Sequence, residues 1–381
     1  MTEAVAGSPD DLSEAESMLL RLVAAGGVAE MKRQQVRASV LRDLILETRP
    51  GWTVPHAGIR LSRVIVDGCL DLEGCTIAKP VLIWHSRFQG GGDRGAILMR
   101  DARLKRLGIH SSTVEGAIVA DRAQVESGIF LGGGLVRGAL QIRGADVTGA
   151  LAIEGTELGD GKTAILAAGL KLSGPLILRR AKIAGEVALP RAVLEAGIYG
   201  EDAVFSHDGV ALSLESARIA GDVLLDRASI SGVLKMSNAR IGGRIAGDGL
   251  SVTATPDAVL AGGLNVGQGI TLTAARITGA MWLDGAEIGK MFRAEGLEVQ
   301  GGETAIGADV IRIGGNWDLA RARLVGAPGP LVGWRRPWVW WPSPATLTSV
   351  DLGDGGPEEP QVSLEVASGV VAVAVGLVPR G

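Results

Sequence analysis

Acidic side chains recur at one position of the chain every 47 residues. They are Glu154, Glu201, Asp248 and Glu295, and Asp226 falls on the same face if two repeat units make one coil. Carboxylates stacked at the spacing of neighbouring strands repel one another unless water, a basic group or a cation screens them. The stripe therefore predicts either a solvated face or a site for a cation or a basic partner. It is also the best starting point for a carbohydrate-processing groove.

Other residue types that support chemistry are few and scattered. Cys69 and Cys75 occupy different positions of neighbouring repeat units, so we expect small packed side chains rather than a redox pair. The histidines share no repeat position and form no metal-ligating pattern; they are His56, His85, His110 and His207. We assign no catalytic or cofactor-binding residue and expect no cofactor, and metal binding stays open.

A cluster of tryptophans and arginines stands near the C-terminal end. Its members are Trp334, Arg335, Arg336, Trp338, Trp340 and Trp341. Such a segment could lie at a membrane interface, form a protein-binding hot spot, or fold as a cap that buries its rings. These three interpretations stay open, and the cluster is a candidate interaction site.

An 11-residue repeat organises the chain that carries these residues. Three consecutive units read AQVESGIFLGG (123–133), GLVRGALQIRG (134–144) and ADVTGALAIEG (145–155), with apolar residues at positions 3, 7 and 9. A 14-residue unit, TELGDGKTAILAAG (156–169), follows and completes a super-repeat of 47 residues. Later super-repeats begin at Ala217, Leu264 and Ile311.

This spacing predicts an all-β solenoid from about Thr53 to Val332. Alternation at positions 7 and 9 is typical of a strand with one buried face, and a small residue near position 5 supplies a turn. The spacing builds no helical stripe, and 11 is a multiple of neither five nor six, which excludes pentapeptide and left-handed hexapeptide solenoids. Two units per coil predict a right-handed parallel β-helix of about 12 coils with 22–25 residues each.

Both ends of a solenoid need caps, because their strand edges are otherwise unpaired. Residues 1–52 are expected to form a tail and a helical cap. Ser13 and Glu16 form a capping box that opens one helix, and a second helix is expected from about Ala29 to Glu47. Residues 333–381 are expected to hold the Trp-rich segment and a disordered tail, above all at Asp351–Pro360.

The composition narrows the classes of function. The 381 residues carry a net charge of −4 with mixed signs, which argues against a dedicated nucleic-acid binder. Two cysteines exclude a disulfide framework. The longest uncharged apolar run, Val366–Val378, has 13 residues, fewer than the ~18 of a membrane-spanning helix. We expect a cytoplasmic protein whose membrane contact, if any, is peripheral.

Several segments carry a resemblance to known proteins. VRASVLRDLIL (36–46), IRLSRVIVDGCLDLEGCTI (59–77) and the ARIxGxLxLxG units resemble actinobacterial proteins labelled "membrane-associated oxidoreductase". The resemblance covers about Val36 to Gly326 and implies a redox activity near a membrane. The residues themselves contain no GxGxxG after a strand, no CxxC and no haem signature. More loosely, the chain resembles bactofilins and pentapeptide-repeat proteins, which act as scaffolds or mimics.

The sequence thus favours a structural role. We expect a bacterial scaffold or binding-surface protein that associates with itself or with a membrane-proximal protein partner, and no nucleic-acid partner. The alternative is an enzyme, either the oxidoreductase that the resemblance implies or a carbohydrate-processing β-helix using the acidic stripe.

Overall fold

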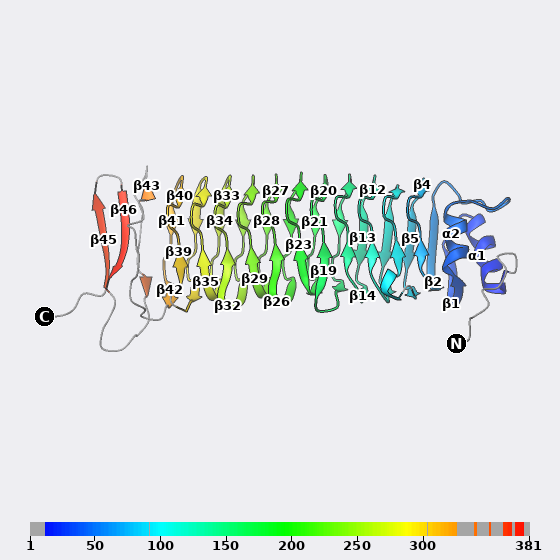
Figure 1. Ribbon diagram of the computed structural model, residues 1–381, viewed down its shortest axis with the longest axis horizontal. Coiled ribbons are helices and arrows are strands. Elements are labelled where there is room, and N and C mark those ends of the chain that lie inside the picture. The colour runs from blue at the N-terminus through cyan, green and yellow to red at the C-terminus, as the bar shows by residue number, and fades with distance from the viewer. Residues whose placement is uncertain are drawn as a thin grey trace. The chain divides into compact units, whose positions relative to one another are not determined.

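The chain folds as a β-solenoid, as the repeat predicts. The structure, a computed structural model, describes residues 12–90, 92–302 and 304–325 and the strands at 339–340, 350–351, 361–367 and 370–376. It is mostly parallel β with about 11 turns, close to the 12 expected, and the described part contains two α-helices (Figure 1). The right-handed sense of the coil stays a prediction. Two compact units, Met1–Gly174 and Pro175–Gly381, are described separately.

Each coil of unit 1 contributes strands to four parallel ladders. The first contains β2 (Ile59–Asp67), β5 (Val81–Trp84), β9 (Leu107–His110), β13 (Ile129–Gly132) and β17 (Leu151–Ala152). The second continues from β2 through β6 (Arg87–Gln89), β10 (Thr113–Val114), β14 (Leu135–Val136) and β18 (Glu157–Leu158). The third contains β3 (Leu70–Asp71), β7 (Ile97–Leu98), β11 (Ile118–Val119), β15 (Leu140–Gln141) and β19 (Thr163–Leu166). The fourth contains β4 (Thr76–Ile77), β8 (Arg103–Leu104), β12 (Gln124–Val125), β16 (Asp146–Val147) and β20 (Lys171–Leu172).

Unit 2 repeats this four-ladder arrangement. The first ladder contains β21 (Leu176–Ile177), β25 (Ile198–Tyr199), β28 (Val223–Leu224), β31 (Ile245–Ala246), β34 (Gly269–Thr271), β37 (Met291–Arg293) and β41 (Trp317–Asp318). The second and third share the long strands β26 (Val204–Ser213), β29 (Ser229–Lys235), β32 (Ser251–Leu260) and β35 (Arg276–Trp282), with β22 (Lys182–Ala184), β23 (Glu186–Ala188), β38 (Glu298–Gln300), β39 (Ile306–Gly307) and β42 (Ala322–Val325). The fourth contains β24 (Val193–Leu194), β27 (Arg218–Ile219), β30 (Arg240–Ile241), β33 (Asn265–Val266), β36 (Glu287–Ile288) and β40 (Arg312–Ile313).

The strand register confirms two repeat units per coil. Ile129 pairs with Leu151, which holds the same position exactly two 11-residue units later in the chain. Leu140 pairs with Ile165, again two units later, although one of these two is the longer 14-residue unit. Each 11-residue unit therefore forms two short strands, at positions 2–3 and 7–8, although the sequence pattern identified only the second.

A tight turn closes many of the units at a position that the sequence pattern did not single out. The carbonyl of Leu225 accepts the N–H of Ala228 at 3.0 Å, and Arg227, the third residue of this turn, has a φ of 56°. A turn of this kind needs a left-handed third residue, which favours glycine. Gly144 and Gly249 fill the same place in their units. Position 11 is thus the corner of the coil.

The small residue near position 5 is required by the close approach of neighbouring coils. A Cβ atom at Gly149 would lie 2.4 Å from the carbonyl carbon of Ser127 on the preceding coil. Neighbouring coils approach too closely at this point for a side chain to fit between them. Glycine there sets the distance between backbones.

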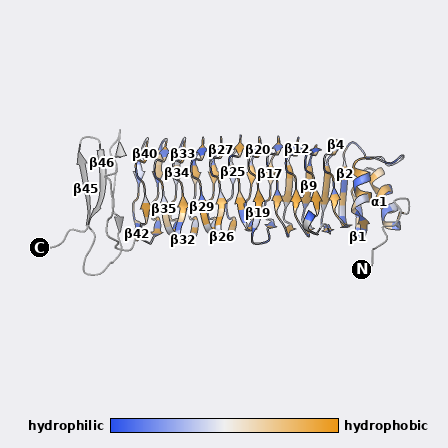
Figure 2. Cartoon of the chain, in the orientation of Figure 1, coloured by the Kyte–Doolittle hydropathy of each residue, from blue (hydrophilic) through white to orange (hydrophobic). Residues whose placement is uncertain are grey.

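Positions 3, 7 and 9 point into the coil. Val125, Ile129 and Leu131 of one unit are at most 2% exposed. The few aromatic residues of the core, Phe88 and Phe205 among them, are fully buried. Figure 2 shows hydrophobic residues recurring along the strands of successive coils. The narrow core is filled by aliphatic side chains because the coil leaves room for little else.

The N-terminal cap contains one expected helix and a strand that the sequence analysis did not predict. Helix α1 (Glu14–Ala24) begins at the capping box of Ser13 and Glu16, as predicted. The helix expected at Ala29–Glu47 is wrong: β1 (Ala29–Arg37) is a strand, and only α2 (Ala38–Ile45) is helical. β1 pairs in parallel with β2, with Val36 opposite Val66, because the edge of the first coil is best satisfied by another strand. Helices α1 and α2 lie next to β1 (Figure 1).

The extra residues of the 14-residue units bulge from the coil. In unit 1, Gly159–Lys162 lies between β18 and β19, where Asp160 accepts the N–H of Lys162 at 2.9 Å. In unit 2, the register shifts across Ser206–Gly209 of β26 and across Thr255–Asp257 of β32. Both unit 2 bulges lie on the same ladder, as two units per coil predict. Gly301–Glu303 follows β38 of that ladder, and Glu303 lies outside the described residues.

Short strands follow the last coil of unit 2. β44 (Val350–Asp351) pairs in parallel with β42, and β45 (Gln361–Ala367) pairs antiparallel with β46 (Val370–Gly376). The segment expected to hold a disordered tail thus also includes the strands at 361–367 and 370–376. The rest of the segment expected to be disordered, 352–360, lies outside the described residues.

The register makes a sharp prediction for two adjacent leucines. Leu225 points into the core and is 1% exposed, whereas Leu224 lies on the outer side and is half-buried. We expect Leu225→Asp to lower the free energy of unfolding by several kcal/mol, since it buries an unpaired charge. Leu224→Asp, the matched control, should cost less than about 1 kcal/mol. Urea unfolding measures both, and similar losses in the two variants would contradict the register.

Glu16 ties α1 to β1 through a buried carboxylate. The Arg37 Nε and Nη2 atoms donate to it at 2.7 Å, and the N–H groups of Ser13 and Arg37 donate at 2.9 and 3.0 Å. Burial works to raise the pKa of Glu16, but these hydrogen bonds and the charge of Arg37 outweigh it and lower the pKa to about 2. The ionised carboxylate is therefore the form that holds the cap together.

This lowered pKa predicts acid sensitivity of the cap. Because the folded pKa lies below the usual 4.5, ionised Glu16 stabilises the fold above about pH 4.5. That contribution, up to about 3 kcal/mol, is lost as the pH falls from 4.5 towards 2. Glu16→Gln should lower stability at pH 7 and flatten its decline in acid, whereas the exposed Glu14→Gln should keep the wild-type profile. Urea unfolding at a series of pH values tests this, and an unchanged slope in Glu16→Gln would contradict it.

Candidate functional site

Part of the acidic stripe forms a row on successive coils of unit 2. The N–H of Asp202, next to Glu201, donates to the carbonyl of Asp226, and the N–H of Arg227 donates to the carbonyl of Asp248. Glu201, Asp226 and Asp248 thus hold equivalent places one coil apart, at positions that alternate with the buried core. The first two are half-buried and the third is exposed.

The aspartates of this row bind backbone groups of the next coil. The N–H of Asp248 donates to Oδ1 of Asp226 at 2.9 Å, and the N–H of Thr273 donates to Oδ1 of Asp248 at 2.9 Å. The same bond recurs in unit 1, where Asp121 accepts the N–H of Arg143 at 2.8 Å. Each carboxylate satisfies a backbone donor at a corner, so the acidic residue has a structural reason to be there.

The glutamates of the stripe have basic partners or neutral neighbours. Glu201 accepts from Nε of Arg179 at 3.0 Å, and Glu295 forms an ion pair with Arg321. Thr273 separates Asp248 from Glu295 along the row. Glu154 follows β17 in unit 1 and is half-buried. In the described part of the chain, no three His, Cys, Asp or Glu side chains come together in a way that could hold a metal ion.

The two cysteines are free and half-buried. Burial raises the pKa of Cys69, and the nearby Asp71 carboxylate raises it further. Cys75 Sγ donates to the carbonyl of Glu73 at 3.4 Å. A raised pKa reduces the thiolate fraction, which is the reactive form in redox exchange. The raised pKa of Cys69 therefore gives no support to a thiol-based redox centre.

The histidines lie at separate places in the fold. His56 and His85 are exposed. His207 lies in the bulge of β26, where its Nδ1 accepts the N–H of Gly209 at 3.0 Å. His110 ends β9 and stacks against Trp84, with ring centroids 6.4 Å apart and planes 20° apart. His110 is the histidine whose ring contacts another aromatic side chain, and it therefore lies where a ligand could be bound.

That contact belongs to a surface that the sequence analysis missed, which we call the aromatic patch. It comprises Leu82, Trp84, Arg106, His110 and Phe130 on β5, β9, β13 and the turn before β9, all half-buried. The guanidinium of Arg106 lies 4.4 Å from the centroid of the Phe130 ring. Burial lowers the pKa of His110, and the charge of Arg106 lowers it further, which favours the neutral imidazole.

A usable signal for this patch existed in the sequence. Leu82 and Phe130 stand at position 8 of their units and Trp84 at position 10, the positions that flank the inward position 9. Large aromatics at outward positions are unusual in a chain with 3% aromatic residues. The units between His85 and Ser112 are irregular, and the coil in which β5 pairs with β9 therefore departs from the regular length. This irregularity hid the alignment of the coils that form the patch.

Most of the Trp-rich segment lies outside the described residues. Trp334, Arg335, Arg336, Trp338 and Trp341 are in this category. Trp340 belongs to β43 (Val339–Trp340), whose backbone pairs antiparallel with β46. The candidate interaction role of the cluster thus stays a prediction.

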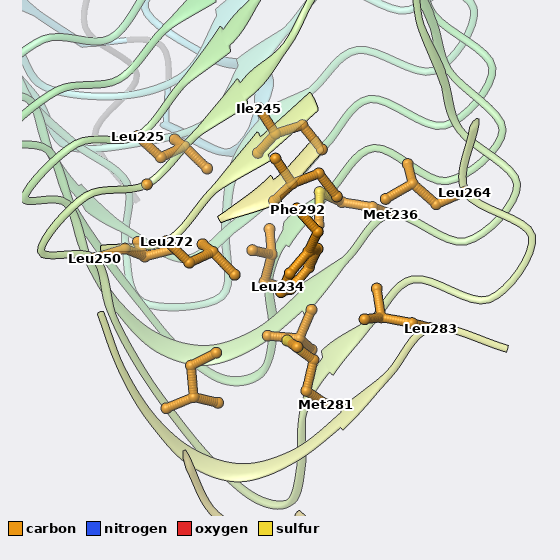
Figure 3. Close-up of a pocket in the computed structure, with 14 residues that line it drawn as sticks. Leu225, Leu234, Met236, Ile245, Leu250, Leu264, Leu272, Met281, Leu283 and Phe292 are labelled. Atoms are coloured by element: carbon orange, nitrogen blue, oxygen red, sulfur yellow. The ribbon is translucent and has the colours of Figure 1, made fainter. Parts of the chain in front are cut away.

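Unit 2 also encloses a small apolar cavity of about 30 Å³ (Figure 3). Its lining includes Leu225, Leu272 and Phe292, and Gly247 stands where other units place an aliphatic side chain at position 9. A space of this size holds about one water molecule, and the lining presents no polar side chain to bind it. The cavity is a packing gap and supplies no ligand site.

Fold and surfaces of the described residues together define a parallel β-solenoid with polar side chains bonded from coil to coil and an aromatic patch on unit 1. Comparison with protein-family models, curated proteins and solved structures gives no match. The resemblance to proteins labelled as oxidoreductases thus stays an expectation. Among the described residues, neither helix is long and apolar enough to cross a membrane.

The hydrogen bond of Asp226 predicts how two substitutions differ. Asp226→Asn keeps an oxygen that can accept the N–H of Asp248, so its stability should stay close to that of the wild type. Asp226→Ala leaves this N–H without its acceptor and should cost roughly 0.5–1.5 kcal/mol. Urea unfolding compares the two variants. Equal losses of stability in the two variants would mean that the negative charge of Asp226, rather than its hydrogen-bond acceptor, stabilises the coil.

Proposed function

We propose that the protein is a structural scaffold that presents a binding surface. The coils hold their outer side chains in fixed rows, and such rows suit the recognition of an extended partner. As partners we propose another protein or a second copy of this chain, near a membrane but not inserted in it. The net charge of −4 supports a partner other than nucleic acid.

One observation carries this proposal: in both units, outer polar groups of several coils are bonded to a neighbouring coil. In unit 1, Arg122 forms two hydrogen bonds to Asp101, at 2.7 and 2.6 Å. In unit 2, Arg227 binds Asp202 in the same way, at 2.7 and 2.8 Å. These bidentate pairs fix the geometry of exposed side chains that would otherwise be free to move. A surface of this kind is held ready for a partner before the partner binds.

The enzyme alternatives receive no specific support. A redox activity would need a reactive thiol or a bound cofactor, and the raised pKa of Cys69 disfavours the first. A carbohydrate-processing site would need two free carboxylates, whereas Asp226 and Asp248 are engaged with backbone donors. A flavin or nicotinamide absorption spectrum in the purified protein would favour the oxidoreductase and contradict the scaffold.

Hydrogen–deuterium exchange tests the rigidity that a scaffold requires. Backbone amides in the ladders, such as those of β13 and β28, should exchange slowly, because each opens only with its neighbouring coils. Amides of the bulge at Ser206–Gly209 should exchange faster and serve as the internal reference. Fast exchange across a run of consecutive coils would contradict a rigid presenting surface.

A further inference from the structure

We infer that the aromatic patch of unit 1 binds an acidic polysaccharide. Trp84 would contact the C–H face of a sugar ring, and Arg106, held over the Phe130 ring, would pair with a uronate carboxylate. The inference rests on the proposed role as a binding surface and adds a polysaccharide ligand to the protein partner proposed there.

The strands of the patch are aligned so that its side chains share one face. Leu82 pairs with Gly108 and Trp84 with His110 between β5 and β9, and Phe130 pairs with Gly108 between β13 and β9. These residues alternate with Ile83 and Ile109, which are buried in the core. The patch therefore lies on the outside of three consecutive coils, whose strands are spaced at about 4.8 Å.

Glycines form the floor of the patch. A Cβ atom at Gly108 would lie 2.8 Å from Cδ2 of Leu82 and 3.2 Å from Nε2 of His110. A Cβ atom at Gly132 would lie 3.1 Å from Nδ1 of His110. The imidazole thus leans over backbone that carries no side chain. No side chain therefore rises from Gly108 or Gly132, which leaves room for a sugar ring to approach the patch.

The arginines at the patch carry positive charge that no described carboxylate neutralises through an ion pair. Arg106 lies over Phe130, and its Nε atom is buried without a hydrogen-bond partner in the described residues. Neither Arg106 nor Arg60, on the neighbouring strand β2, forms an ion pair with a described carboxylate. On the next ladder, by contrast, Arg87 and Arg137 both bind Glu115, at 2.9 Å. An anionic ligand would complement the patch.

Ring contacts and positive charge together favour an acidic polysaccharide over other anions. An open face contacts a small molecule on one side only, whereas an extended chain of rings can contact all three coils. Nucleic acid derives its affinity from many phosphate contacts, and this face offers two arginines. A polymer of uronic acids presents a sugar ring and a carboxylate in each residue, which matches aromatic rings beside a guanidinium.

Unit 2 supplies a matched control. The guanidinium of Arg179 lies 5.0 Å from the ring centroid of Tyr199, an arrangement similar to that of Arg106 and Phe130. There, however, Glu201 binds Arg179 and neutralises its charge. Comparing variants of the two pairs shows whether binding requires an arginine without an ion pair above an aromatic ring, or only an arginine above a ring.

Affinity electrophoresis of the full chain tests the inference, with polygalacturonate in the gel and dextran or single-stranded DNA in parallel gels. Polygalacturonate should retard the wild type, and Trp84→Ala and Arg106→Gln should each weaken binding at least tenfold. Trp84→Phe should retain most of the binding, and Tyr199→Ala should match the wild type. Thermal unfolding of each variant checks that it is folded.

Three outcomes would overturn the inference. The first is that polygalacturonate does not retard the wild type, or retards all variants equally. The second is equal binding of neutral dextran, which would remove the role of Arg106. The third is tighter, patch-dependent binding of DNA, which would assign the patch to nucleic acid. If the ladders still resist hydrogen exchange in any of these cases, the scaffold proposal survives without this ligand.

Discussion

The hydrogen bonds between successive coils are the interaction on which the rest of the structure depends. The ladder strands of a coil bond only to the coils before and after, as when Leu225 donates to Ala246 at 2.6 Å. No coil can therefore satisfy its own backbone, and each is folded only within the stack. This requires every coil to have nearly the same path. The tight turn at position 11, the close glycine contact near position 5 and the inward positions 3, 7 and 9 all serve that requirement.

The same stacking creates an electrostatic problem on the outside of the coils. Equivalent residues lie about 4.8 Å apart, so a repeated charge would stack upon itself. The chain solves this in two ways. Opposite charges alternate at the corners, as with Asp202 and Arg227, and aspartates such as Asp226 turn towards backbone donors of the next coil. An arginine at a left-handed corner is strained relative to glycine, and its bidentate ion pair fixes its side chain against the neighbouring coil. Regular packing thus dictates much of the surface chemistry.

Much of the fold was predictable because it follows from the 11-residue period of the apolar residues. The positions of Ile129 and Leu131, and the pairing of two units per coil, follow from the repeat. The strand at Ala29–Arg37 was not predictable in this way, because its state is decided by the unpaired edge of β2, which comes later in the chain. The corner at position 11 was hidden because Arg122 and Arg227 occupy places where glycine is the recognisable signal. The aromatic patch needed the alignment of Trp84 with His110, which an irregular coil obscures.

The bulges of unit 2 carry a consequence for protein engineering. Ser206–Gly209 and Thr255–Asp257 leave the same ladder two coils apart, while the strands on either side keep their pairing. The coil therefore tolerates added backbone at these points without a change in its closure. Foreign peptides grafted at both points would be displayed about 10 Å apart on one side of the unit, as two coil steps dictate. Such a unit could serve as a molecular ruler for arranging epitopes or binding loops at defined intervals.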